Sequence, residues 1–473
     1  MNETLAPELP GSLQWLNAAA GSLHDQRGKA VALAFVNAGS VWSSHRLNEL
    51  AILQARYLGR LHVLAVHVPR FDSERDPQRV LKRLRRQGVA LPIAQDADWE
   101  AWQRFGVEAW PTVLLIDGEG RIRHRVVGLD VPGELERAVS ELCDALPMPY
   151  DDDLAPFREG SPEPRLTLRF PTGLAVTEHR LYVADSGHHR VLECNHSGQV
   201  LRQFGNGAAD FVDGDGIQAA FRRPQGLVVL RESLYVADTG NHALRRINLA
   251  NGSVDTLCGN GRAGIISEGV VSSPRDVVLN QPCALTVVGN RIHLAMAGEN
   301  RIWAYDLGTR ELLVNAGSGK LDVRDGSAQV ASFAQPVGLA AVQQMLYVCD
   351  ELGSSLRAVQ LRNDVVQTLV GSGPWEFGDQ DGPRETARLQ QPQAITLSPG
   401  VPQLWVADTG NGRLRTLRLG GGELSTVTLP RRLHGPAGLA ADAESVWIAE
   451  TDAHAVLRYN IASGELSDVP ITE

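Results

Sequence analysis

The stretch "PQGLVVLRESLYVADTGNHALR", residues 224–245, predicts three short β-strands in a row. Its aliphatic and β-branched runs are separated by polar turn residues such as "DTGN" (238–241). The same order occurs in five other copies, which begin at residues 171, 282, 336, 392 and 436. The six copies start 44 to 58 residues apart, so the sequence predicts an array of similar structural units.

Further β-prone residues stand before each next copy, so every unit is expected to hold four strands. Short strands repeated in this way are typical of a β-propeller, and six units predict six blades. Two segments compete for the outer strand that closes the ring, "RLTLRF" (165–170) and "ELSDVPI" (465–471). The sequence leaves both alternatives open.

The chain before the repeats alternates between strand-like and helix-like segments. The expected strands are residues 31–36, 61–68, 112–117 and 121–128, and the expected helices are residues 44–57, 76–87 and 133–145. We therefore expect an α/β domain over residues 1–145 and a propeller over residues 165–473. The segment between them, residues 146–164, is rich in proline and acidic residues and is interpreted as a linker.

The order of elements in the first domain resembles the thioredoxin-like fold. That resemblance places the redox motif Cys-x-x-Cys at Ser40-Val41-Trp42-Ser43 and a cis-proline at Trp110-Pro111. Serine cannot exchange with disulfides, because the reaction needs a thiolate nucleophile and a second sulfur. We therefore expect a redox-inactive domain whose serines cap a helix, with no catalytic role for the neighbouring His45.

The propeller units resemble NHL repeats, and nearly the whole chain is similar to the NHL-repeat-containing protein 2 family. The shared features include "LQWLN" (13–17), His45, "WPT" (110–112) and "SSPRDVV" (272–278). Members of that family commonly carry cysteines where this chain has Ser40 and Ser43. The resemblance thus implies a thioredoxin-like domain fused to a six-bladed NHL propeller.

Several repeated polar patterns in the propeller imitate functional sites. The acidic residues Asp185, Asp238, Asp350, Asp408 and Glu450 end the second strands, and we interpret them as turn-forming residues bonded to their own backbone. The Asp-Gly pairs at residues 213–214, 325–326 and 381–382 are likewise interpreted as turns and not as calcium ligands. "GNGRAG" (259–264) matches a dinucleotide motif but has no helix after it, so it is assigned to a turn.

Composition narrows the classes of partner and compartment. The formal net charge is −10, which disfavours nucleic acid as a partner, and no apolar run is long enough to span a membrane. Five scattered cysteines without a metal or redox spacing fit a reducing compartment. We expect a cytoplasmic protein without a cofactor or a metal ion.

Two classes of function remain. The first is a non-catalytic interaction or scaffold protein. The second is a hydrolase or lyase that acts on a small ligand in the propeller's axial channel. Metal-dependent catalysis needs His, Asp or Glu on several inner strands, and the six segments that begin with the repeat proline contain none of them. His434, just before the last of these segments, is the nearest candidate, and the interaction protein is preferred.

One face of the propeller is the expected binding surface. The turn after the second strand and the link into the next blade emerge on the same side, because strands within a blade alternate in direction. This loop-rich face carries the insertions 205–223, 259–281, 317–335 and 371–391. Long loops on a rigid scaffold commonly carry binding function, so we expect a protein partner, or the first domain, to dock there. The candidate contact residues are His188, His189, Arg222, Arg223, Asn241, His242, Arg301, Trp375, Phe377, Asn411, Arg413 and His434.

Overall fold

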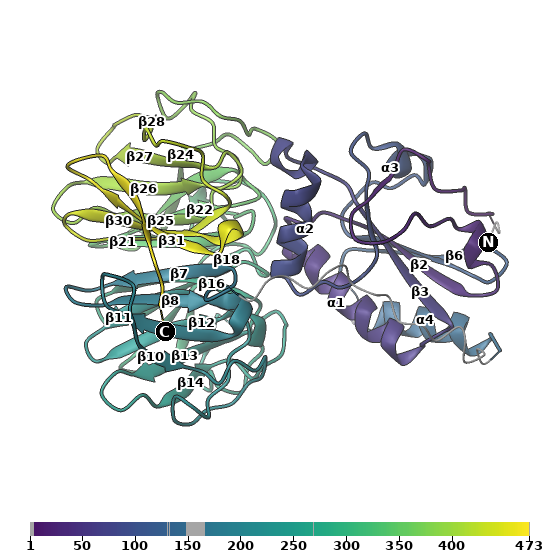
Figure 1. Cartoon of the computed structure of the whole chain (residues 1–473), viewed down its shortest axis with the longest axis horizontal. Coiled ribbons are helices and arrows are strands. Elements are labelled where there is room, and N and C mark those ends of the chain that lie inside the picture. Colours follow the sequence, from purple (N-terminus) through teal and green to yellow (C-terminus); the bar gives the residue numbers. More distant parts are fainter. Residues whose placement is uncertain (1–3, 130, 132, 148–165, 268, 473) are drawn as a thin grey trace. The chain divides into compact units, whose positions relative to one another are not determined.

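The computed structural model describes residues 4–129, 131, 133–147, 166–267 and 269–472. They fall into two compact units, one that ends at Pro164 and one that begins at Arg165. Figure 1 shows the helices and strands of both units. Most of the expected linker, residues 148–164, lies outside the described residues.

A six-stranded sheet forms the centre of the first unit, in the order β1-β4-β3-β2-β5-β6. Its strands are β1 (Gln14–Trp15), β2 (Ala30–Val36), β3 (Leu61–His67), β4 (Ile93–Gln95), β5 (Thr112–Ile116) and β6 (Ile122–Val127). β2 pairs in parallel with β3 and antiparallel with β5. All seven residues of β2 are buried, as expected for a central strand that is covered on both faces.

Helices cover the sheet on both sides. They are α1 (Val41–Arg56), α2 (Pro77–Arg86), α3 (Glu100–Arg104) and α4 (Glu134–Asp144). One core cluster joins the sheet to apolar residues of α1, α2 and α4, and a second joins the opposite face to α3 and the N-terminal segment. The sequence did not predict α3, β1 or β4, because these elements are too short to show a hydrophobic period.

The second unit consists of six antiparallel sheets, so the predicted six-bladed propeller is confirmed. Blade one holds β7 (Pro171–Val176), β8 (Leu181–Asp185), β9 (Arg190–Cys194) and β10 (Val200–Phe204). Blade two holds β11 (Pro224–Leu230), β12 (Ser233–Asp238), β13 (Ala243–Asn248) and β14 (Val254–Cys258). Blade three holds β16 (Pro282–Val288), β17 (Arg291–Met296), β18 (Arg301–Asp306) and β19 (Leu312–Ala316).

The remaining three blades repeat this order. Blade four holds β21 (Pro336–Val342), β22 (Met345–Asp350), β23 (Ser355–Gln360) and β24 (Val365–Val370). Blade five holds β25 (Ala394–Leu397), β26 (Gln403–Asp408), β27 (Arg413–Arg418) and β28 (Leu424–Thr426), and blade six holds β29 (Pro436–Ala441), β30 (Ser445–Glu450), β31 (Ala455–Asn460) and β32 (Leu466–Val469). Blades three and four each gain a fifth, two-residue strand from an insertion, β15 (Val270–Val271) and β20 (Gly326–Ser327), which the sequence did not predict.

Neighbouring blades are joined near the axis. The first strands of adjacent blades pack against one another around the ring, which confirms that they are the inner strands. In blades one, two, five and six, a hydroxyl just after the second strand donates to the carbonyl oxygen of the next blade's first proline. This bond is 2.7 Å long from Thr239 Oγ1 to Pro282 and 2.6 Å from Thr451 Oγ1 to Pro171.

The ring closes through residues near the end of the described chain. β32 forms the outer strand of blade six, so of the two candidate segments it is 465–471 that supplies this strand. Thr472 then pairs with the outer strand of blade one, where its carbonyl oxygen accepts a hydrogen bond of 2.9 Å from the Val200 N–H. Ile471 is buried in a cluster shared by blades one and six.

Candidate functional site

The serines of the first unit form a helix cap at the position expected for a redox motif. Ser40 is the N-cap of α1, and its Oγ accepts a hydrogen bond of 3.3 Å from the Ser43 N–H. The Ser43 Oγ accepts a bond of 3.1 Å from the Asn37 N–H, and Ser43 is only 1% exposed. The helix begins at residue 41, three residues earlier than predicted, because this cap satisfies its first donors.

The other expected landmarks of this site are also in place. The Trp110–Pro111 peptide bond is cis, as predicted. Val41 is buried, and the side chains of Trp42 and His45 are partly buried. Trp110 packs against Trp102, with ring centroids 4.7 Å apart, in a cluster of indole rings that also includes Trp99.

A buried polar network that the sequence did not reveal supports the loop before α1. The Asn37 side chain donates to the Glu74 carboxylate over 2.7 Å, and the Ala38 N–H donates to His67 Nδ1 over 3.1 Å. His67 is fully buried, and burial lowers its pKa. These groups come from separate segments of the chain, so no local sequence motif predicts that they are in contact.

The cysteines of the chain lie away from this motif in sequence and are buried. All five are free thiols. Burial raises the pKa of Cys143 to about 11 and that of Cys194 to about 12. A thiol with so high a pKa is almost entirely protonated at neutral pH and is therefore a poor nucleophile.

The repeated aspartates of the propeller are structural, but the donors described for them are side chains and the backbone of a distant link, where the sequence predicted the backbone of their own turns. Asp238 is fully buried, and its carboxylate accepts bonds of 2.8 Å from Arg245, from the Asn241 side chain and from the Arg222 N–H. The equivalent carboxylates in blades four and five pair with Arg357 and Arg415 in the same way. The acidic residues thus join three parts of one blade.

The Asp-Gly loops complete the same clusters. Asp213 accepts hydrogen bonds from Arg245 and from the N–H and hydroxyl of Thr256, a residue of the outer strand. Asp325 and Asp381 hold the equivalent groups in blades four and five. These carboxylates therefore fix each insertion to its own blade. No group suited to bind a metal ion occurs among the described residues.

Blade three departs from this pattern. Met296 stands where other blades have the aspartate, and Trp303 stands where three blades have the buried arginine. The Trp303 Nε1 donates instead to Glu299 over 3.2 Å. Burial raises the pKa of Glu299 to about 7, although Arg301 and the bond from Trp303 act in the opposite direction.

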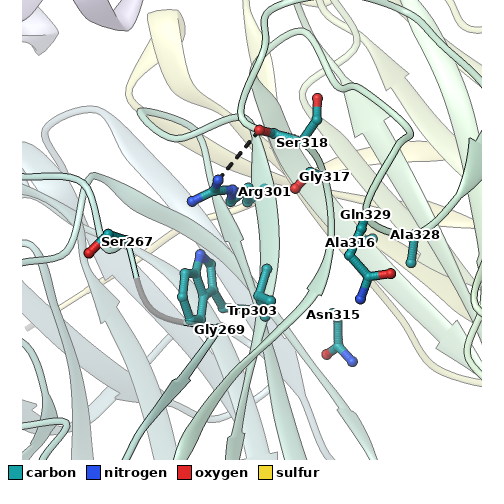
Figure 2. Close-up of a pocket in the computed structure, with 11 residues that line it drawn as sticks. Ser267, Gly269, Arg301, Trp303, Asn315, Ala316, Gly317, Ser318, Ala328 and Gln329 are labelled. Atoms are coloured by element: carbon teal, nitrogen blue, oxygen red, sulfur yellow. Dashed lines mark hydrogen bonds between the residues drawn. The ribbon is translucent and has the colours of Figure 1, made fainter.

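A pocket of about 240 Å³ lies beside this altered cluster (Figure 2). It is lined by β18 and β19, by Ser267 and Gly269 of the insertion before blade three, and by the insertion before blade four. Among the lining residues that the structure describes, Arg301 is the charged one, and its guanidinium donates to the carbonyl oxygens of Ile266, Gly317 and Ser318. Its guanidinium also lies 3.8 Å from the Glu299 carboxylate, so the positive charge is shared between the backbone and this ion pair.

The loop-rich face has the construction that strand alternation predicts. In each blade the turn after the second strand bonds to the link that enters the same blade, as in the Gly240 N–H bond of 2.8 Å to the Arg222 carbonyl oxygen. Arg222, Trp375 and His434 are exposed there, whereas His188, His189, Arg223, His242, Arg301, Phe377 and Arg413 are partly buried. Asn241 and Asn411 are buried, and their amides bond to Asp238 and Asp408. Those two side-chain amides therefore stabilise the fold and are not available at the surface.

The chain resembles known proteins over most of its length. The NHL repeat model matches residues 168–194. The Arabidopsis thaliana protein SUPPRESSOR OF QUENCHING 1, chloroplastic, is 30% identical over 98% of this chain, which spans only 48% of that relative. Thiol-disulfide oxidoreductase YkuV of Bacillus subtilis (strain 168) is similar to a smaller part of the chain: it is 25% identical over 29% of this chain and 92% of its own length.

The first unit is therefore thioredoxin-like. None of the described helices has the length and apolar character needed to cross a lipid bilayer. NHL repeat-containing protein 2 of Gallus gallus is 30% identical over 98% of this chain and 71% of its own length. With the thioredoxin-like unit followed by six NHL-type blades, this chain belongs to the NHL repeat-containing protein 2 family.

Proposed function

We propose that this chain is a non-catalytic interaction or scaffold protein that combines a redox-inactive thioredoxin-like domain with a binding surface on its propeller. The observation that carries the proposal is the use of Ser40 and Ser43. Their hydroxyls stand at the two positions where sulfur is required, and each accepts a backbone hydrogen bond in a helix cap. The domain keeps the architecture of its relatives without a thiol at either position of the motif to attack a disulfide.

The propeller contributes a binding surface and no catalytic site to this proposed function. Its inner strands present no His, Asp or Glu, and the carboxylates at the ends of its second strands are taken up by arginines and backbone donors. The loop-rich face offers exposed charged and aromatic side chains such as Arg222 and Trp375. These residues favour binding of a protein partner. Five free cysteines support a cytoplasmic location, where thiols stay reduced.

Redox inactivity is tested with the purified full chain. The rate of insulin reduction in the presence of dithiothreitol is expected to equal the uncatalysed rate. A Ser40→Ala variant serves as the matched control, because it keeps the fold but removes the hydroxyl. Turnover of the wild-type chain above the uncatalysed rate would overturn the redox part of the proposal, and its loss in Ser40→Ala would assign that activity to the helix cap.

The binding part is tested with a partner isolated from the native organism and then purified. Its dissociation constant is measured for the wild-type chain and for a variant with Arg222→Glu, Arg223→Glu, Trp375→Ala and Phe377→Ala. A control variant carries Arg231→Glu, Arg310→Glu and Arg362→Glu, which lie in turns on the opposite face. We expect only the first variant to lose affinity. A loss of affinity in the control variant alone would show that the partner binds the face opposite the loop-rich face.

A further inference from the structure

The six links that enter the blades share one short pattern. Each has an apolar residue, two variable residues and the proline that begins the first strand. The links are "LRFP" (168–171), "FRRP" (221–224), "LNQP" (279–282), "FAQP" (333–336), "LQQP" (389–392) and "LHGP" (433–436). Because the pattern is fixed, the variable positions can be compared directly between blades.

The first variable residue has the same backbone anchor in five blades. Its N–H donates to the carboxylate that ends the second strand, over 2.7 Å for Arg169 to Asp185 and 2.8 Å for Arg222 to Asp238. Equivalent bonds form from the N–H groups of Ala334, Gln390 and His434. This position therefore recurs at equivalent places around the axis, on the loop-rich face. Its residue is exposed in blades one, two and six and buried in blades four and five.

A glycine makes room for these side chains. A Cβ added to Gly187 would lie 2.6 Å from the Cγ of Arg169, and one added to Gly240 would lie 2.7 Å from the Cγ of Arg222. Both distances are far shorter than a normal contact between carbon atoms. The aliphatic stems of the two arginines thus lie across the turns, and both residues are exposed.

Charge is distributed unequally among the six equivalent places. Blades one and two have arginine at the first variable position, whereas blades three, four and five have Asn280, Ala334 and Gln390. The second variable position holds Arg223 in blade two and uncharged residues in the other five blades. We call the group Arg169, Arg222 and Arg223 the basic sector.

His189 shows that the members of the basic sector are close together. Its Nδ1 accepts a hydrogen bond of 3.1 Å from the Arg223 N–H, across the junction between blades one and two. The pKa of His189 is lowered to about 4, first by burial and then by the positive charges of Arg223, Arg222 and Arg169. The sector is therefore a local concentration of positive charge on a chain whose net charge is −10.

We propose that the basic sector binds the carboxylates of an acidic segment in a protein partner. This inference rests on the proposed function and specifies the chemistry of the partner. The guanidinium groups are suited to it, because arginine binds a carboxylate through two parallel hydrogen bonds. Within the described part of the propeller, the guanidinium of Arg222 donates to the Ala209 carbonyl oxygen and forms no ion pair, so donors remain for an incoming anion.

The extent of the sector favours a short acidic segment over a nucleic acid. A polyanion must be neutralised over many phosphates, and the net charge of −10 would repel those beyond the sector. A segment with a few acidic residues can instead place its charge within two neighbouring blades. The same net charge would orient such a partner, because it is attracted only at this part of the surface.

The test uses the full chain and a fluorescein-labelled peptide of alternating Asp and Glu, about ten residues long, in fluorescence anisotropy at about 50 mM salt. The doubly substituted Arg222→Glu, Arg223→Glu chain is expected to bind it at least about tenfold more weakly. The Arg222→Gln, Arg223→Gln chain should lose less affinity, because it removes charge without adding repulsion. The equivalent Asn and Gln peptide should not bind.

Arg231→Glu is the matched control. Arg231 lies in blade two, is exposed and has a φ of 55°, close to the 49° of Arg223, but it occupies a turn on the opposite face. Affinity for the acidic peptide should stay within about twofold of the wild type in this variant. An equal loss in Arg231→Glu, or no binding of the acidic peptide by the wild type, would overturn the inference. Tighter, sector-dependent binding of a single-stranded oligonucleotide would overturn it in favour of nucleic acid.

This result is separable from the proposed function. If a partner binds through the loop-rich face and its affinity is unchanged in the Arg222→Glu, Arg223→Glu chain, the inference about the basic sector is refuted. The proposal that the chain is an interaction protein would still hold. Folding of each variant is checked by the midpoint of thermal unfolding, so that a lost contact is distinguished from a lost structure.

Discussion

The guanidinium of Arg245 donates to the carboxylate of Asp238 over 2.8 Å, and neither side chain has any exposed surface. A second carboxylate, that of Asp213, lies 2.9 Å from the other end of the same guanidinium. One arginine therefore joins the second strand, the third strand and the preceding insertion of blade two. Burial raises the pKa of Asp238 to about 6, and Arg245 opposes this rise.

Arg245→Ala is expected to lower the free energy of unfolding of the propeller by about 3–5 kcal/mol, because it leaves a buried carboxylate without its partner. The matched control is Arg246→Ala, whose exposed ion pair with Asp255 is worth less than about 1 kcal/mol. Urea denaturation followed by circular dichroism measures both values. Equal losses in the two variants would show that the buried cluster does not hold the blade together.

The sequence contained a signal for these clusters that local interpretation missed. Asp and Arg recur seven residues apart at Asp238 and Arg245, at Asp350 and Arg357, and at Asp408 and Arg415. The Asp-x-Gly pattern suggested a local turn, but the partners of the aspartate are set by strand register and by a link sixteen residues upstream. Repetition predicted the propeller well because each blade has local contacts.

The parts of the structure that the sequence did not decide depend on distant segments. Ring closure required the contact between Thr472 and the outer strand of blade one, which lie far apart in the chain. At the serine cap, the positions of Ser40 and Ser43 followed from order along the chain, whereas the support from Glu74 and His67 did not. Tertiary contacts of this kind leave no periodic pattern.

Glu299→Gln is expected to change the pH dependence of stability. The pKa of Glu299 is about 7 in the folded chain and 4.5 for the unperturbed group, so folding favours its protonated form. Below pH 4.5 the group is protonated in both states. As pH rises toward 7 the unfolded chain loses this proton first, so the stability that Glu299 contributes is progressively lost.

The size of this effect follows from the two pKa values. Their difference corresponds to about 3 kcal/mol. As pH rises from about 5 to about 8, the free energy of unfolding of Glu299→Gln should therefore increase by up to that amount relative to that of the wild type. Glutamine can still accept the bond from Trp303. Urea denaturation across this range measures the difference, and a gap between the two proteins that does not vary with pH would contradict the prediction.

Restoring sulfur should restore a dithiol in the thioredoxin-like unit. The doubly substituted Ser40→Cys, Ser43→Cys chain is expected to form an intrachain disulfide, because the Ser40 side chain already lies against the backbone N–H of Ser43 at the helix cap. The N-terminus of α1 also lowers the pKa of a thiol placed there. Alkylation and mass spectrometry with and without reductant detect the bond, and the Ser40→Cys chain is the control. Two freely alkylated thiols under oxidising conditions would show that the cap geometry does not bring the sulfurs together.

Closure of the propeller depends on the buried side chain of Ile471. This residue is 8% exposed and belongs to a core cluster that contains apolar residues of blades one and six. Its neighbour Thr472 forms backbone hydrogen bonds with Gly198 and Val200 of blade one. The segment thus acts as a bridge across the junction where the ring is joined.

Ile471→Ala should destabilise the propeller by about 2–5 kcal/mol, because it removes buried methyl groups and leaves a cavity at that junction. Leu201→Ala is the matched control, since Leu201 is in the adjoining outer strand of blade one but is 42% exposed, and its loss should stay below about 1 kcal/mol. Hydrogen exchange adds a local readout: the Val200 N–H, which donates to Thr472, should exchange faster in Ile471→Ala, whereas the Val254 N–H of blade two should be unchanged. Equal protection of Val200 in the wild type and in Ile471→Ala would mean that the ring is held closed by the inner strands alone.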